Sequence, residues 1–294
     1  MQSVPAFEEG TFSHSGHTLS YESHGSGERV VVLLHGILLD AGVNRNLARA
    51  LAAHGYRVVL LDLLGHGRSA RPRHSAVHRM DLYARQVVAL LDHLGVESAV
   101  IGGVSLGADV ALQVAVLAPG RVRGLIAEMP VLENAAPVAA MIFVPMMMTL
   151  NYFGPVFRAV GSMVRRLPRG WHAAVDGVLA IVAADPQETA AVLHGVLLGP
   201  VAPTIEEREA VEAPTLVIGH RSDVLHPYSD AANLARQIPN AELLQARSVA
   251  ELRVSPARLT TAIADFLDRA WQESPAVPAR DATSAVRLEG SAGS

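Results

Sequence analysis

Apolar residues fall into short continuous runs that alternate with stretches in which they recur every three or four positions. Continuous runs of four to six residues are typical of strands buried on both faces, and the wider spacing is typical of helices with one buried face. The predicted strands are residues 30–34, 56–61, 99–104, 122–127, 215–218 and 242–245, and the predicted helices are residues 44–54, 80–94, 108–117, 229–236 and 256–271. This alternation predicts an α/β fold with a mostly parallel central sheet flanked by helices.

The alternation stops between residues 131 and 204, where Met-, Ala- and Val-rich helical patterns are broken by Pro and Gly. We expect this segment to form a helical cap inserted into the sheet domain. The chain then divides into a first core segment (1–130), the insertion (131–204), a second core segment (205–271) and a tail (272–294). The tail is rich in Ala, Pro, Ser and Gly and has no periodicity, so we expect it to be disordered.

The composition of the chain excludes several classes of partner, nucleophile and cofactor. Half of the residues are apolar, enough for a large core, and the net charge is only −4 with the arginines scattered, so no nucleic-acid partner is expected. The chain has no Cys, and all 24 basic residues are Arg, which excludes thiolate metal ligands, Cys nucleophiles and Schiff-base lysines. No metal-ligand cluster or dinucleotide-binding glycine pattern is present, so no cofactor and no metal are expected.

Two segments of the sequence are informative about secretion and membrane insertion. Residues 1–10 contain Glu8 and Glu9 and lack the apolar run of a secretory signal, so a cytoplasmic protein is expected. Residues 135–150 are the most apolar stretch, but Pro137 and Pro145 interrupt it and it is shorter than the roughly 20 residues of a membrane span. We therefore expect no stable membrane insertion.

The strongest chemical signal is the segment Gly103-Val104-Ser105-Leu106-Gly107, which lies between a predicted buried strand and a predicted helix. A Gly-x-Ser-x-Gly segment in this context forms a sharp turn that exposes the serine hydroxyl as a nucleophile. A helix-capping serine in a Gly-rich turn is the structural alternative.

From these residues the chain resembles the α/β-hydrolase fold superfamily over about residues 10–271. The resemblance implies that the backbone N–H groups of Ile37, in Leu34-His35-Gly36-Ile37, and of Leu106 form an oxyanion hole. It also implies that Asp223, just after the strand at 215–218, is the acidic member of a catalytic triad.

The chain departs from the family at the catalytic histidine. In the family this residue follows the last strand, but the sequence has no His after His226. His226, three residues after Asp223, is the first candidate for the general base, because a turn can bring the two side chains into contact. His220 is a weaker candidate, and His194 or His172 of the insertion are further alternatives.

We expect a serine hydrolase that cleaves an apolar carboxylic ester or lipid-like substrate through an acyl-enzyme on Ser105. Met141, Phe143 and Met147 are expected to line the substrate cavity, although packing on the core would explain the same pattern. The absent C-terminal histidine leaves two alternatives: a catalytically silent ligand-binding protein, and a lyase, isomerase or acyltransferase that uses the oxyanion hole.

Overall fold

The computed structural model describes residues 7–166, 179–221, 223–248 and 251–273. Its strands are β1 (Phe7–His14), β2 (His17–His24), β3 (Val30–Leu34), β4 (Arg57–Asp62), β5 (Ala99–Val104), β6 (Val122–Glu128), β7 (Thr215–His220) and β8 (Ala241–Ala246). Its helices include α1 (Arg45–Ala53), α2 (Met80–His93), α3 (Leu106–Leu117), α4 (Ala135–Tyr152), α5 (Gly154–Val164), α7 (Pro186–Leu197), α8 (Ile205–Glu209), α9 (Tyr228–Gln237), α10 (Glu251–Val254) and α11 (Ala257–Glu273).

The strands form one eight-stranded sheet in the order β1-β2-β4-β3-β5-β6-β7-β8. From β4 to β8 every pairing is parallel, and β2 pairs antiparallel with both β1 and β4. The predicted α/β fold with a mostly parallel sheet is confirmed. Because parallel strands all end at the same edge, the loops that follow β3, β5 and β7 meet there.

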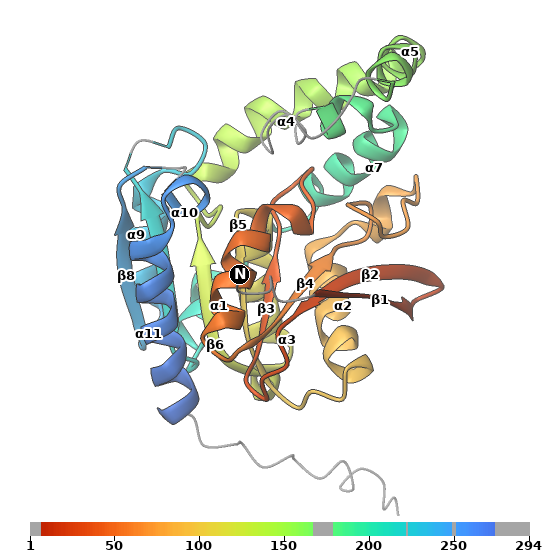
Figure 1. Ribbon diagram of the computed structural model, residues 1–294. Helices are drawn as coiled ribbons and strands as arrows, with labels where there is room; N and C mark the ends of the chain where they lie inside the picture. The colour runs from red at the N-terminus through yellow and green to blue at the C-terminus, as the bar shows by residue number, and fades with distance from the viewer. Residues whose placement is uncertain (1–6, 167–178, 222, 249–250, 274–294) are drawn as a thin grey trace, which may run out of the picture.

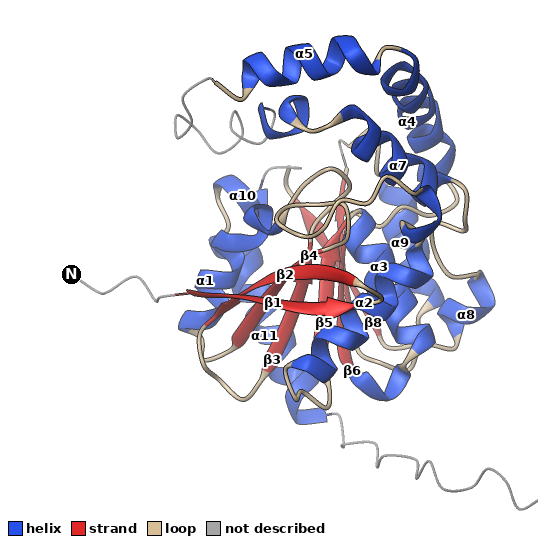
Figure 2. Cartoon of the chain, turned by 90° about the vertical axis from the view of Figure 1, so that its right-hand side faces the viewer, coloured by secondary structure: helices blue, strands red, loops and turns tan. Residues whose placement is uncertain are grey.

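Helices cover both faces of the sheet (Figures 1 and 2). Adjacent strand residues point to opposite faces, so Val32 packs in the layer that contains α2, α3 and α9, and Val31 packs in the layer with α1 and α11. Both residues are fully buried, which explains why the central strands are apolar without interruption.

Two regions differ from the expectations. The β1–β2 hairpin was not predicted, because β1 is an edge strand in which Phe12 is the one buried residue, so it carries little apolar signal. At the other end, α11 continues through Glu273, which corrects the predicted start of the disordered tail at residue 272. Residues 274–294 of that tail lie outside the described part of the chain.

Three long helices, α4, α5 and α7, lie between β6 and β7 in the chain and above the carboxyl edge of the sheet (Figure 2). We call them the inserted helices. Pro145 lies inside α4 without ending it, so α4 is one helix of 18 residues. By length and composition alone α4 could cross a membrane, and 11% of it is buried in the structure.

Candidate active site

Ser105 lies at the sharp turn between β5 and α3. Its backbone has φ 53° and ψ −119°, a conformation that L-residues rarely adopt and that is held here by a hydrogen bond from the Ser105 N–H to the Glu128 carbonyl (2.9 Å). The positions of Gly103 and Gly107 leave no space for a side chain. A Cβ on Gly103 would lie 2.5 Å from the backbone of Gly107, and a Cβ on Gly107 would lie 2.5 Å from the Leu34 carbonyl oxygen.

The loop after β7 brings an acid and a histidine together with this serine. The Asp223 Oδ1 atom accepts the backbone N–H groups of Leu225 (2.9 Å) and His226 (3.0 Å), which closes a tight turn. The Nδ1 atom of His226 lies 2.8 Å from Asp223 Oδ2, and its Nε2 atom lies 2.9 Å from Ser105 Oγ. His226 therefore bridges the acid and the serine.

The charge on Asp223 fixes the direction of these hydrogen bonds. Burial by itself raises the pKa of this carboxyl, but hydrogen bonds from the His226 backbone and ring outweigh it, and the pKa is lowered. An ionised carboxylate can only accept, so Nδ1 carries the proton and Nε2 presents its lone pair to the Ser105 hydroxyl. This arrangement can move the hydroxyl proton to Nε2.

The other candidate histidines lie elsewhere. His220 is buried, with its Nδ1 atom 2.9 Å from the Ser248 carbonyl and its Nε2 atom 3.5 Å from Glu128. His194 is an exposed side chain on α7. His172 lies outside the described residues.

The segment after β3 lies beside Ser105. A Cβ built on Gly36 would lie 3.7 Å from the Ser105 Cβ, so the Ile37 backbone follows directly next to the serine. Leu106 is the first residue of α3, where backbone N–H groups lack a partner within the helix. Of the two amides predicted for an oxyanion hole, that of Leu106 adjoins Ser105 in the chain, and that of Ile37 belongs to a segment that lies beside Ser105 in space.

A sequence profile described as alpha/beta hydrolase fold matches residues 29–250. The chain belongs to the alpha/beta hydrolase family. It is 32% identical over 254 residues to a 2-hydroxy-6-oxononadienedioate/2-hydroxy-6-oxononatrienedioate hydrolase of Pseudomonas putida, covering 76% of this chain and 82% of that one.

Solved structures agree on the fold of this α/β hydrolase. A thermophilic esterase from Thermogutta terrifontis is similar at TM-score 0.69 and 26% identity, covering 88% of this chain and 97% of that one. An enol-lactonase from Burkholderia xenovorans is similar at TM-score 0.71 and 20% identity, covering 88% and 100%. The general activity of a hydrolase follows from the family and its relatives.

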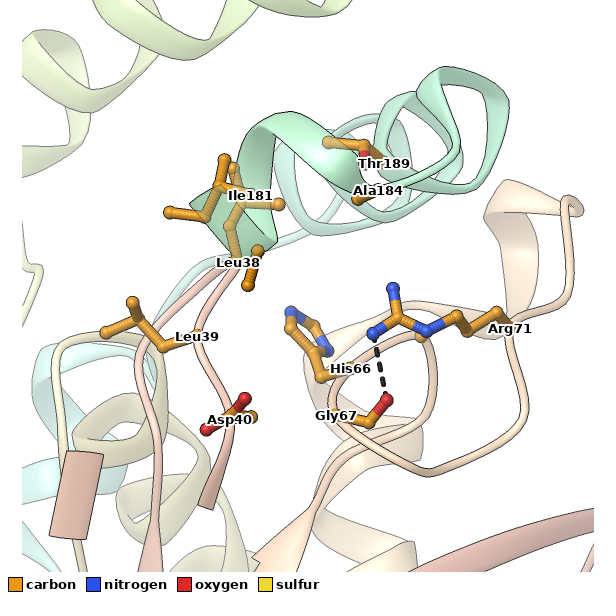
Figure 3. A pocket seen from close by; sticks show the side chains of 11 residues that line it. Leu38, Leu39, Asp40, His66, Gly67, Arg71, Ile181, Ala184 and Thr189 are labelled. Carbon is orange, nitrogen blue, oxygen red and sulfur yellow. Dashed lines mark hydrogen bonds between the residues drawn. The ribbon is translucent and has the colours of Figure 1, made fainter. Parts of the chain in front are cut away.

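A pocket lies beside the segment that directly follows Ile37 (Figure 3). It is lined by Leu38, Leu39, Asp40, Gly65, His66, Gly67, Arg71, Ala180, Ile181, Ala184 and Thr189. His66 is 2% exposed and its ring points into the pocket, with Nδ1 donating to the Leu64 carbonyl (3.1 Å) and no hydrogen-bond partner at Nε2. Burial lowers the pKa of His66, so the ring is neutral and Nε2 is a free acceptor.

The three residues expected to line the substrate cavity differ in their exposure in the structure. Met141 is 77% exposed on the outer face of α4, which corrects its predicted place in the cavity, because the helical period turns it away from the sheet domain. Phe143 is partly buried against a small cluster that Leu225, the neighbour of His226, also contacts. Met147 is half-buried, and its role stays a prediction.

Two buried acids near the site were not singled out in the sequence. Asp230 of α9 accepts the backbone N–H groups of Leu132 (2.9 Å), Asn134 (3.1 Å) and Ala135 (2.9 Å). Asp109 of α3 accepts the N–H of Val131 (3.0 Å). An acid on the apolar face of a predicted helix is the signal that points to such a role.

Among the described residues, no group of three or more His, Asp or Glu side chains is arranged to hold a metal ion.

Proposed function

We propose that this α/β hydrolase cleaves carboxylic esters of apolar acids through an acyl-enzyme on Ser105. One observation carries the proposal: His226 contacts both Asp223 (2.8 Å) and Ser105 (2.9 Å), which is the geometry required of a general base. Such a base makes the weakly acidic serine hydroxyl a nucleophile at neutral pH.

In the first step Ser105 Oγ attacks the ester carbonyl carbon while its proton passes to His226 Nε2. The negative charge on the carbonyl oxygen is stabilised by the N–H groups of Ile37 and Leu106. The C–O bond to the alcohol then breaks, and the alcohol leaves with the proton from Nε2. Water, deprotonated by the same Nε2, attacks the acyl-enzyme and releases the acid and the free serine.

The inserted helices favour an apolar substrate. They act as a cap over the carboxyl edge of the sheet, and Phe143 and Met147 offer apolar surface on the side of α4 nearer the site. The name of the Thermogutta relative, an esterase, supports the ester class.

The test is covalent labelling with a fluorophosphonate probe together with turnover of p-nitrophenyl butyrate. We expect Ser105→Ala to abolish both signals. His226→Ala should reduce both about as severely, because the two residues act as one unit. His194→Ala is the matched control and should retain activity, since its side chain is exposed on α7.

Other outcomes would favour the alternatives. Full turnover by His226→Ala would place the base elsewhere. Binding of apolar ligands by the wild type, with neither labelling nor turnover, would indicate a ligand-binding protein. Labelling of Ser105 without release of acid from any simple ester would indicate a lyase or acyltransferase.

A further inference from the structure

The outer faces of α4 and α5 both expose large apolar side chains, and we call these two faces together the apolar arm. On α4 its residues recur with helical spacing, and on α5 they do so again after a short turn. They are Met141, Val144, Met148, Tyr152, Phe153, Val156, Phe157, Val160 and Met163, all of them exposed. Figures 1 and 2 show both helices at the top of the molecule, projecting away from the sheet.

Packing among the described residues of the chain does not cover this surface. The inner face of α4 is the one that contacts the protein, through Ala135, Ala139 and Phe143. On the outer face Met141 is 77% exposed and Tyr152 is 76% exposed. Large exposed apolar patches are rare on monomeric soluble proteins and mark sites that contact a membrane, another protein or a ligand.

The charges around the apolar arm favour one kind of partner. Between Glu133 and Asp176 the sequence contains four arginines and no acidic residue, although the whole chain carries a net charge of −4. Three of these arginines, Arg158, Arg165 and Arg166, belong to α5 or directly follow it. An apolar helical face accompanied by arginines is the composition of helices that lie in the interface of anionic membranes.

The same charges disfavour a second copy of this chain. Face-to-face association of two apolar arms would gather the arginines of both α5 helices without an acid from either arm to pair with them.

We propose that the apolar arm docks this protein reversibly onto the surface of an anionic lipid bilayer. The helix α4 lies along the surface instead of crossing it, because Asp230 holds its first turn and Phe143 holds its inner face on the protein. The exposed methionines and aromatic residues enter the acyl region, and the exposed Arg166 contacts lipid phosphates.

Docking would bring the loop of His226 near the lipid, with α4 between them, because Leu225 and Phe143 pack on the same cluster beneath α4. An ester dissolved in the bilayer would then be close to the site. This consequence rests on the proposed function, whereas the docking itself does not.

The experiment is co-sedimentation of the full chain with two sets of vesicles, one of pure phosphatidylcholine and one containing about one-third phosphatidylglycerol. We expect binding to the anionic vesicles that weakens as salt is added. The double variant Met141→Glu/Tyr152→Glu should lower the bound fraction about tenfold, since two charges would enter the acyl region. Arg166→Glu should reduce the preference for anionic vesicles.

Two controls separate docking from other effects. Val254→Glu introduces the same charge at a residue that is 79% exposed on α10, outside the apolar arm, and should bind as the wild type does. Ser105→Ala should bind normally even though it cannot form an acyl-enzyme, so failure of docking and failure of catalysis are distinguished.

The proposal is overturned if the wild type does not sediment with anionic vesicles, or if Val254→Glu loses binding as the arm variant does. A lipid-free dimer that Met141→Glu dissociates, with no vesicle binding, would identify a second copy of the chain as the partner instead.

Discussion

Asp223 and His226 are neighbours on one loop, and the contact between them depends almost entirely on local structure. One carboxylate oxygen of Asp223 accepts two backbone N–H groups of its own turn, and the other accepts the His226 ring. The acid thereby shapes the loop and orients the base at the same time. Ser105 is the remote partner, 121 positions away in the chain.

We predict that Asp223→Asn strongly lowers turnover. The amide would present an N–H toward Nδ1, so the ring would adopt the tautomer that carries its proton on Nε2 and could no longer accept from Ser105. We expect kcat for p-nitrophenyl butyrate to fall by roughly 10³- to 10⁴-fold. Asp265→Asn, at an exposed position of α11, is the matched control. A loss below about tenfold would mean that Asp223 does not orient the base.

Side chains of two core helices, α9 and α3, bind the backbone at the start of α4. Asp230 on α9 accepts three backbone N–H groups and the Asn134 side-chain amide (2.7 Å), and Asp109 on α3 holds the preceding residue, Val131. The N–H groups of Asn134 and Ala135 lie at the start of α4, where no intrahelical acceptor exists, and those of Val131 and Leu132 lie in the segment just before it. The position of α4 is therefore set by side chains of the core.

We predict that Asp230→Ala loosens the start of α4. Several buried N–H groups would lose their acceptor at a cost of about 1–3 kcal/mol each, so the free energy of unfolding should fall by about 3 kcal/mol or more. Hydrogen exchange should show faster exchange at the amides of Leu132, Asn134 and Ala135, with the sheet amides still protected. Asp265→Ala should change neither quantity. Unchanged exchange at these three amides would contradict the role given to Asp230.

At the scale of the whole molecule, one buried carboxylate joins three distant segments. Glu22 of β2 is fully buried and accepts hydrogen bonds from Arg45 of α1 (2.6 Å) and from Arg68 of the turn after β4 (2.9 Å). Burial by itself raises the pKa of Glu22, but the hydrogen bonds and charges of the arginines and His24 outweigh it and lower the pKa from 4.5 to about 2. The charged form thus stabilises the folded state.

We predict the acid dependence of stability from this group. A carboxyl with a lowered pKa stabilises the fold above its unfolded value, so its contribution should be complete above pH 4.5 and be lost as the pH falls toward about 2. Glu22→Gln should lower the free energy of unfolding at pH 7 by about 2–3 kcal/mol, since the arginine ends are partly solvated. Urea denaturation between pH 7 and pH 2.5 should then show a flatter profile for the variant.

The control is Glu242→Gln, which removes a solvent-exposed partner of Arg269 and should change stability by less than about 0.5 kcal/mol. Equal pH profiles for Glu22→Gln and the wild type would exclude Glu22 as a source of the acid sensitivity.

The sequence by itself determined the α/β fold, because strands buried on both faces must be continuously apolar and covering helices must repeat their apolar residues every three or four positions. It also predicted the Ser105 turn, and it made His226 the first of several candidate partners for Asp223, since a turn can bring side chains three residues apart into contact. The tertiary structure alone decided that the His226 ring reaches Ser105, because that contact depends on which strand ends are adjacent in the sheet. It likewise decided which face of α4 is covered: every face is apolar, so the pattern could not separate the inner Phe143 from the outer Met141.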